Sequence, residues 1–206
     1  NLSECCDAIC AYIDNPEITV EELMKYIKGP DFPTGGIIQG HQGIRDAFET
    51  GRGRIVIRSK TEIEVGESGR ETIVVTEIPY MVNKKEMIEK IAELVENKKI
   101  EGIAYINDET TMKDGVRVIL RLKKDANSNV VLNTLFKYTP LQSSFSINNV
   151  ALVNGRPRLL NLKDLIKYFV KHRHEVIVRR TKFDLDKALK RAHILEGLLK
   201  ALDVID

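Results

Sequence analysis

The residues with the strongest potential for metal chemistry are the histidines of the stretch KHRHEVIVRR, residues 171–180. Histidine is a common zinc ligand, so the first question is whether His172 and His174 share a metal ion. Two positions along a helix differ by about 200° of rotation, which directs these two rings to opposite sides. His41 and His193 lie far away in the sequence and beside no cysteine or carboxylate cluster with ligand spacing. The spacing therefore argues against a metal site.

Motifs for covalent catalysis or phosphate binding are also missing from the sequence. It contains neither a serine elbow of the GxSxG type nor a Walker lysine loop, and the glycines between residues 35 and 43 do not have the spacing of a phosphate loop. We therefore predict no catalytic, cofactor-binding or metal-ligating residue in this chain. A stand-alone enzyme is the least favoured class of function.

Three cysteines, Cys5, Cys6 and Cys10, lie close together on a predicted helix. An odd number of cysteines with no partner elsewhere does not form a disulfide framework. Cys6 and Cys10 are one helical turn apart, beside Ile9 and Ile13, which predicts a common apolar face. We expect reduced, half-buried core thiols and no zinc.

The positive charge of the chain is regional. Residues 1–50 contain three basic and nine acidic side chains, which leaves 29 basic and 21 acidic side chains in residues 51–206. The overall net charge of +2 therefore hides a basic region that suits an anionic partner.

A basic strand is the best candidate for binding that partner. Residues 54–65 alternate with period two, which places Arg54, Arg58 and Lys60 on one face, with Arg52 just before them. Successive residues on one face of a strand are about 6 to 7 Å apart, close to the phosphate spacing along one DNA strand. We predict that these four residues contact the phosphates of duplex DNA. No aromatic residues are interleaved with them, so base stacking on single strands is not indicated.

Two alternatives remain open for these charges. If the hairpin loop is residues 66–69, Arg58 stands opposite Glu77 and is neutralised there. A second basic surface is the predicted helix 171–191, with eight basic and three acidic residues, but such a charge run is more often a solvated helix face.

The elements that position these residues follow from periodicity and from turn and capping residues. Helices are expected at 2–13, 20–27, 44–48, 83–97, 128–138 and from 161 onward. Antiparallel strands are expected at 54–65 and 70–79, at 103–107 and 116–123, and at 144–153 and 156–160. Ile55, Ile57, Ile63 and Val65 should point inward. Thr19 and Asn83 should begin helices, and Asn154-Gly155 should form a turn.

This order predicts an α+β fold, in which a two-layer antiparallel sheet with helices is preceded by short helices and followed by a long helix. We divide the chain into a helical lead-in (1–30), an α+β domain (31–160) and the long helix (161–206), part of which should project or pair with another helix. No apolar run is long enough for a membrane span, and the composition is that of a cytosolic protein. Because the chain starts at Asn1 and stops within a helical pattern, we expect a segment of a longer protein.

Five stretches carry a resemblance to a known family. They are GPDFPTGGIIQG (29–40), TGRGR (50–54), EIPYMVNK (77–84), LQSSFSINNVALVNGRP (141–157) and RRTKFDLDKALKRAHILEGLLKALDVID (179–206). These resemble, in order and over the whole length, the A subunits of bacterial type IIA DNA topoisomerases. The resemblance is closer to DNA gyrase than to its paralogue topoisomerase IV.

The resemblance implies a tower domain that flanks the DNA gate segment and leads into a coiled coil. In that family a tyrosine that follows an arginine in an upstream winged helix cleaves DNA, and no tyrosine here follows an arginine. The chain alone should therefore be inactive. Mg²⁺ and ATP are expected on the B subunit. The implied partners are the B subunit, double-stranded DNA and a second A subunit, in an A2B2 assembly near the nucleoid. The alternatives are a purely structural spacer without DNA contact and the topoisomerase IV A subunit.

Overall fold

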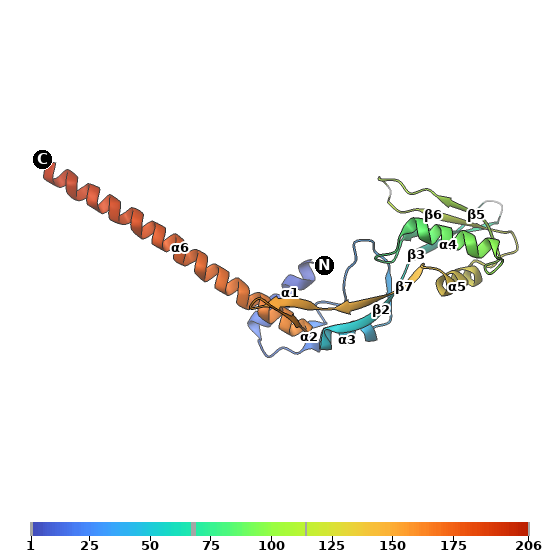
Figure 1. Cartoon of the computed structure of the whole chain (residues 1–206), viewed down its shortest axis with the longest axis horizontal. Coiled ribbons are helices and arrows are strands. Elements are labelled where there is room, and N and C mark those ends of the chain that lie inside the picture. The colour runs from blue at the N-terminus through green and yellow to red at the C-terminus, as the bar shows by residue number, and fades with distance from the viewer. Residues whose placement is uncertain (1, 67–68, 114, 206) are drawn as a thin grey trace.

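The computed structural model describes residues 2–66, 69–113 and 115–205, with side chains up to residue 202. A body of sheets and short helices occupies one end of the molecule, and one long helix projects from it (Figure 1). The helices are α1 (Leu2–Asp14), α2 (Val20–Leu23), α3 (Gln42–Thr50), α4 (Lys84–Glu96), α5 (Ser128–Tyr138) and α6 (Leu162–Ile205). The strands are β1 (Ile37–Gln39), β2 (Arg52–Arg58), β3 (Lys60–Val65), β4 (Glu71–Glu77), β5 (Ile103–Asp108), β6 (Val118–Leu122), β7 (Gln142–Asn148), β8 (Val150–Val153) and β9 (Arg156–Leu159). The predicted α+β class is confirmed.

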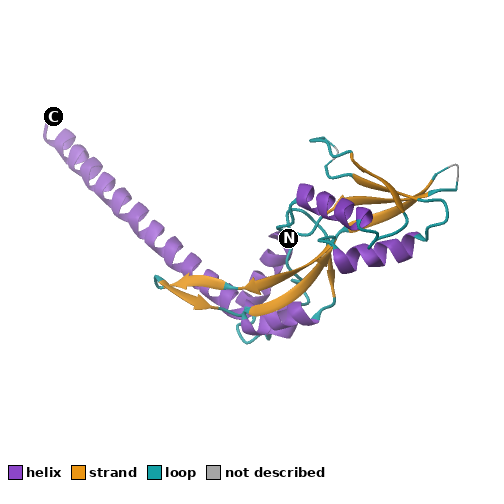
Figure 2. Ribbon diagram, turned by 45° about the vertical axis from the view of Figure 1, so that its right-hand side comes forward, coloured by secondary structure: helices purple, strands orange, loops and turns teal. Residues whose placement is uncertain are grey.

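The outer half of the body is a four-stranded antiparallel sheet in the order β3-β4-β6-β5, packed against α4 and α5 (Figure 2). It consists of two β-β-α units, β3-β4-α4 and β5-β6-α5. Ile73 and Val75 of β4 are fully buried against Met87 and Ile91 of α4 and Leu135 of α5. Met87, Ile91 and Leu94 are three or four positions apart, a spacing that places them together on the buried side of α4.

The inner half is a three-stranded antiparallel sheet in the order β1-β2-β7, with β2 in the middle. Ile55 and Ile57 of β2 pack into a second core with Ile44 and Phe48 of α3. Residues of α1, α2 and the first turns of α6, such as Leu162, complete this core. The long helix is therefore anchored to the half of the body that contains the basic strand.

The strand expected over residues 54–65 is in fact two strands in different sheets. At the break, the buried Ser59 donates its backbone N–H to the carbonyl of Leu141 at 2.8 Å. The hairpin is consequently β3-β4 and not 54–79, and two residues of its expected loop, 67 and 68, lie outside the described residues. Ile63 and Val65 were expected inward but are 39% and 67% exposed, because β3 is an edge strand.

The strand expected over residues 144–153 is also divided, at Asn149. Its N–H donates to the carbonyl of Gly51 at 2.8 Å, and its carbonyl accepts from the N–H of Leu160 at 2.9 Å. The hairpin β8-β9 follows, with φ values of 52° at Asn154 and 75° at Gly155. Two consecutive positive φ values are typical of a type I′ turn, so the predicted turn is confirmed.

Helix starts are well predicted by their capping residues. The Thr19 hydroxyl accepts from the N–H of Glu22 and the Glu22 carboxylate accepts from the N–H of Thr19, which forms a capping box. The backbone N–H of Thr19, and then its hydroxyl, donate to the Glu22 carboxylate and lower the pKa of Glu22 below its ordinary value. The Asn83 side chain caps α4 as expected. The predicted helix 20–27 is shorter, since α2 ends at Leu23.

The long helix α6 has 44 residues, of which only the first turns are packed against the body. Leu162 and Ile166 are buried, whereas Phe183 and Leu189 further along are 68% and 60% exposed. The expectation that part of this helix projects is confirmed (Figure 1). In the part of the chain that the structure describes, no helix has the length and apolarity needed to cross a membrane.

The expectation of half-buried cysteines is wrong. Cys5, Cys6 and Cys10 are all exposed free thiols. Helix α1 buries the side that carries Ala8, together with Ala11 and Tyr12, and this side is turned away from Cys6 and Cys10. The apolar residues of α1 surround most of the helix, so periodicity did not single out the buried side.

Candidate nucleic-acid interface

Three of the four predicted DNA-binding residues lie together on the middle strand of the inner sheet. Arg52, Arg54 and Arg58 alternate along β2 with Ile55 and Ile57, whose side chains are buried on the opposite face. Arg52 and Arg54 are exposed, and Arg58 is half-buried. The alternation predicted from the sequence is therefore present over the length of β2.

The face that carries these arginines, here called the arginine face, contains no acidic residue. The antiparallel register places uncharged side chains beside the arginines: Asn148 opposite Arg52, Ser146 opposite Arg54 and Gln142 opposite Arg58. The complete set is Ile37 and Gln39 of β1, Arg52, Arg54, Val56 and Arg58 of β2, and Gln142, Ser144, Ser146 and Asn148 of β7. Its charge is consequently positive along its whole length.

Arg52 and Arg54 form no ion pair with any residue that the structure describes. One terminal nitrogen of Arg54 donates to the Ser144 hydroxyl at 3.1 Å, a neutral partner on the neighbouring strand. The hydroxyl orients the guanidinium without neutralising it, and Arg retains further donors for an anion.

Arg58 has a different environment, at the junction of the two halves of the body. Its Nε donates to the side-chain oxygen of Gln142 at 2.6 Å, and its guanidinium carbon lies 4.8 Å from the ring centroid of Phe136 on α5. The alternative in which Glu77 neutralises Arg58 is not found, because Glu77 belongs to the outer sheet and stands opposite Lys60. Arg58 thus connects the arginine face to the outer half.

Lys60 is not on the arginine face, which corrects the predicted four-residue ladder. It is the first residue of β3 in the outer sheet, opposite Glu77, and its Nζ lies 3.7 Å from Glu77 Oε1. The chain crosses from one sheet to the other at Ser59, and the register shifts between Lys60 and Thr61. A partner that binds Arg52 and Arg54 therefore meets Lys60 only if it extends onto the second sheet.

Comparison with known proteins identifies the family of this chain. A family model that describes the A subunit of DNA gyrase/topoisomerase IV matches residues 1–206. The chain belongs to this family. Over all 206 residues it is 56% identical to the DNA gyrase A subunits of Clostridium acetobutylicum and Staphylococcus epidermidis and 57% identical to that of Ureaplasma parvum. It covers 25%, 23% and 24% of these proteins, or about a quarter of their length.

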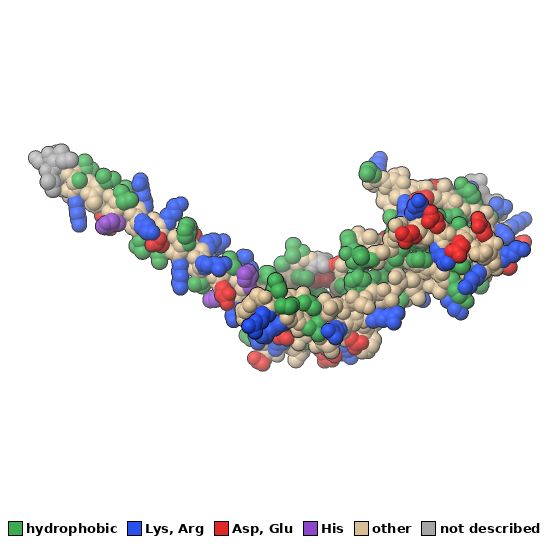
Figure 3. Space-filling view, viewed as in Figure 1, with side chains coloured by type: hydrophobic (Ala, Val, Ile, Leu, Met, Phe, Trp, Pro, Cys, Tyr) green, Lys and Arg blue, Asp and Glu red, His purple; other side chains and the backbone are tan. Residues whose placement is uncertain are grey.

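The second basic surface of this member of the gyrase/topoisomerase IV family, on α6, is less regular. Lys190 lies 2.8 Å from Asp186 and Lys171 lies 4.0 Å from Glu175, so acids are mixed with the bases along the projecting helix. Figure 3 shows Lys and Arg side chains pointing in several directions from the helix.

Within the described residues, no group of three or more His, Cys, Asp or Glu side chains is placed to hold a metal ion.

The polar side chains of β7 were not predicted as part of this interface. Ser144, Ser146 and Asn148 are exposed and lie beside the arginines. Their alternation with Phe145 and Ile147 is typical of a half-buried strand, which was the available signal. They carry no charge, and only the pairing of β7 with β2 brings them to the arginine face.

Proposed function

We propose that this chain is a non-catalytic, DNA-flanking tower segment of a DNA gyrase A subunit. The observation that carries this proposal is the arginine face, a rigid sheet surface with Arg52 and Arg54 outside any described ion pair, exposed hydroxyl and amide groups and no acid. Arg58 contributes positive charge at one end, and Lys60 extends it on the neighbouring sheet. The four predicted DNA contacts are retained, with Arg52 and Arg54 as the principal pair.

The chemistry of this face suits a phosphate backbone. Guanidinium groups, hydroxyls and amides donate to phosphate oxygens, and such contacts fix the position of a duplex without reading its sequence. Alternate residues of a strand repeat at about 6 to 7 Å, similar to consecutive phosphates of one strand. Because the donors stand on a sheet, little conformational entropy is lost when they bind.

The role of this contact follows from the resemblance to type IIA topoisomerases. In the complete enzyme, which would introduce negative supercoils, the segment would support a bent duplex. Another part of the same protein would break that duplex and let a second one pass through, with ATP and Mg²⁺ bound on the B subunit. Smooth bending of a 20 to 30 base-pair site costs on the order of 1 to 6 kcal/mol, which contacts along the flanks offset. A second A subunit, two B subunits and a bacterial cytoplasmic, nucleoid-associated location belong to the same proposal.

Salt-dependent DNA binding tests the proposal. The affinity of the chain for a duplex of about 25 base pairs would be measured at several salt concentrations, with Arg52→Ala/Arg54→Ala as the variant. Each lost phosphate contact lowers the slope of log affinity against log salt by about 0.9, so the double variant should lose about 1.8. An unchanged slope rejects the arginine face as the contact.

Two alternatives compete with this proposal. A structural spacer that only supports the long helix is suggested by the packing of Arg58 against Phe136, and it predicts weak binding with no salt slope. A topoisomerase IV A subunit is compatible with the family model, whose description includes both enzymes. Gyrase is preferred because the relatives with 55–57% identity are DNA gyrase A subunits.

A further inference from the structure

The hairpin β8-β9 projects from the inner sheet, with its turn at the end farthest from the outer half (Figure 2). Its cross-strand pairs place Val150 opposite Leu159 and Leu152 opposite Pro157. All four side chains are exposed, Val150 by 53% and Leu152 by 74%. One face of the hairpin, here called the apolar hairpin face, therefore consists of Val150, Leu152, Pro157 and Leu159.

The apolar hairpin face continues the arginine face along one extended stretch of chain. Exposed and less exposed residues alternate without interruption from Ser144 of β7 to Leu152 of β8. Between the two strands, the half-buried Asn149 donates its side-chain amide to the carbonyl of Ala47 at 3.5 Å. Ala47 belongs to α3, which covers the opposite side of the inner sheet. Leu152 therefore stands on the same side as Asn148 of the arginine face.

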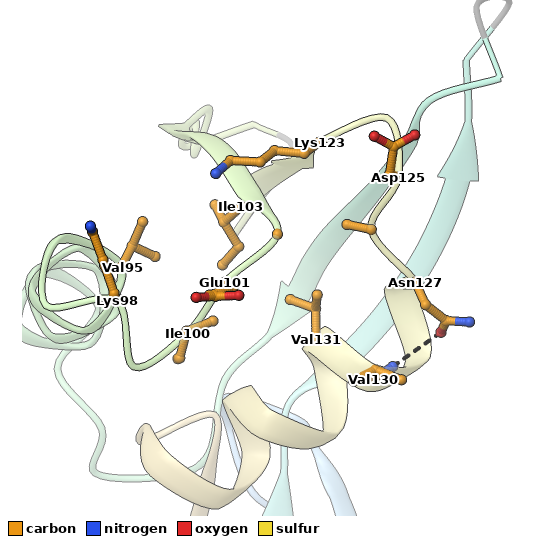
Figure 4. A pocket seen from close by; sticks show the side chains of 12 residues that line it. Val95, Lys98, Ile100, Glu101, Ile103, Lys123, Asp125, Asn127, Val130 and Val131 are labelled. Carbon is orange, nitrogen blue, oxygen red and sulfur yellow. Dashed lines mark hydrogen bonds between the residues drawn. The ribbon is translucent and has the colours of Figure 1, made fainter.

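The strands that form this continuous surface contain no acidic residue. Residues 50–61 and 126–163 have neither Asp nor Glu, although the chain contains 30 of them. Asp125, the last acid before the second segment, lies in the loop that leads into α5 of the outer half (Figure 4). Arg156 and Arg158 are exposed on the other face of the hairpin and form no ion pair with a described residue. The hairpin thus extends the positive charge of the arginine face, which suits a polyanion.

The composition of the hairpin indicates which part of a duplex it fits. Proteins that bind the minor groove combine arginines with apolar side chains such as Leu and Pro, which they insert between base steps. The apolar hairpin face has no hydrogen-bonding side chain with which to read base edges in the major groove. Pro157 has no N–H, which disfavours the addition of a protein strand to β9.

The distance along the strand also allows one duplex to reach both surfaces. Arg52 stands opposite Asn148, and the four residues from Asn148 to Leu152 span about 13 Å of extended chain. This is the length of about four base pairs at 3.4 Å each. The tight turn at Asn154-Gly155 joins the two strands that carry Leu152 and Pro157.

We propose that the hairpin β8-β9 lies along the minor groove of the duplex held by the arginine face and inserts Leu152 and Pro157 into it. The inference rests on the proposed DNA binding of the arginine face, and it adds an apolar contact with the bases to the contacts with phosphates. The amino group of guanine stands in the minor groove, so this contact should favour base pairs that lack it.

The test measures the affinity of the 206-residue chain for three duplexes of about 25 base pairs by fluorescence anisotropy. One is rich in A·T pairs, one is rich in G·C pairs, and the third has the G·C-rich sequence with inosine in place of guanine. Inosine lacks the amino group in the minor groove and keeps the major-groove acceptors of guanine. The chain should bind the A·T and inosine duplexes several-fold more tightly than the guanine duplex.

The variant Leu152→Gln/Pro157→Gln should bind the inosine duplex about tenfold more weakly and lose the preference over guanine, because two apolar side chains no longer leave water. Its slope of log affinity against log salt should stay unchanged, because no phosphate contact is lost. Leu152→Met keeps an apolar side chain and should keep the preference. Val65→Gln is the matched control, since Val65 is an apolar side chain, 67% exposed, on β3 of the outer sheet. It should bind like the unchanged chain.

The outcomes separate this inference from the function on which it rests. If the hairpin variant keeps its affinity while Arg52→Ala/Arg54→Ala loses salt slope, the inference is wrong and the arginine face remains the DNA contact. Equal affinity for the guanine and inosine duplexes would also overturn it. If neither variant changes binding, both proposals are rejected. A dimer in sedimentation that Leu152→Gln/Pro157→Gln dissociates would assign the apolar hairpin face to a second copy of the chain.

Discussion

The carboxylate of Glu77 accepts a hydrogen bond from the backbone N–H of Gly36 at 2.6 Å. Glu77 is the last residue of β4 in the outer sheet, and Gly36 directly precedes β1 of the inner sheet. The other oxygen of the same carboxylate lies 3.7 Å from Lys60, just after the chain crosses between the sheets. One side chain therefore ties together the two halves of the body at the point where their backbones meet.

Replacement of Gly35 by alanine should lower the free energy of unfolding by more than the cost of the left-handed backbone conformation alone. Gly35 has φ of 70°, and an added Cβ would lie against the Glu77 carboxylate and displace it from Gly36. The left-handed backbone costs about 1 to 2 kcal/mol with alanine, and the lost charge-assisted hydrogen bond adds about 1.5 to 3 kcal/mol. Urea denaturation gives the free energy of unfolding.

Gly155→Ala is the matched control for Gly35→Ala, since Gly155 has φ of 75° and no atom within 4 Å of an added Cβ. It should show only the backbone cost. Equal destabilisation by the two substitutions would mean that the Glu77 contact contributes nothing.

Arg58 and Arg54 should differ in their effect on folding. Arg58→Ala removes the hydrogen bond to Gln142 and the packing on Phe136, which should cost about 1 to 2 kcal/mol. Arg54→Ala removes one hydrogen bond at an exposed position and should change the free energy of unfolding by less than about 0.5 kcal/mol. Denaturation midpoints of the two variants measure this difference. Equal midpoints would show that Arg58 has no structural role at the junction.

The sequence predicts those parts of the fold that depend on local chemistry. The side chain of Asn83 caps the start of α4, as expected for an asparagine at this position. The helical spacing of Met87, Ile91 and Leu94 correctly indicates the buried side. The division at Ser59 has no local signal, because period two continues from Arg58 to Lys60. Only the pairing with Leu141, far along the chain, shows that one strand ends there.

Asp108 should give the outer sheet a pH-dependent stability. Hydrogen bonds from Lys84, and then from Thr110, hold the pKa of Asp108 below its ordinary value. A lowered pKa in the folded state stabilises the fold above the ordinary aspartate pKa of about 3.9, and this stabilisation is lost as the pH falls through the lowered value. Lys84→Gln should raise the pKa of Asp108, which a carboxyl NMR titration measures.

The stability of Lys84→Gln completes this test. The pair is partly exposed, so the substitution should cost no more than about 1 kcal/mol at neutral pH. As the pH falls through the lowered pKa of Asp108, the difference should shrink, because a protonated Asp108 no longer attracts the lysine. A difference that is independent of pH would assign the loss to packing of the lysine stem.

The three thiols of α1 should react readily in the native chain. Cys5, Cys6 and Cys10 are exposed and free, so an aromatic disulfide reagent should modify all three without denaturant. The denatured chain serves as the control, because its thiols react at the rate of full access. If two of the thiols react more than about a hundredfold more slowly than in the denatured chain, they are buried, because burial limits the access of the reagent. The apolar face that the sequence predicted for Cys6 and Cys10 would then be correct.

The sequence predicts some residues of the arginine face and not others. Arg52 and Arg54 were found because alternation along one strand is a local pattern. Lys60 was assigned to the wrong sheet because the period-two alternation continues from β2 into β3. Ser144 was not predicted because the candidate residues were chosen by their positive charge, and a hydroxyl carries none.

The arginine face should contribute more to DNA binding than the basic residues of α6. Arg52 and Arg54 stand on a rigid sheet with uncharged neighbours, whereas Arg179 and Arg180 lie on the projecting part of α6, in a stretch that also contains acidic residues such as Asp184. Rigid charges without acidic neighbours lose less entropy on docking and keep more of their attraction for phosphate. In the complete protein, Arg52→Ala/Arg54→Ala should reduce the salt slope by about 1.8 and weaken binding to all duplex sequences alike.

Arg179→Ala/Arg180→Ala is the charge-matched comparison for that variant, since it removes the same two charges from the other surface. Its salt slope should change by less than about 0.9, which is the change expected for the loss of one phosphate contact. If the helix variant instead loses the larger slope while the strand variant keeps its affinity, the duplex lies along α6. The arginine face would then be a solvated surface of the sheet, and its lack of acidic residues would have no bearing on DNA.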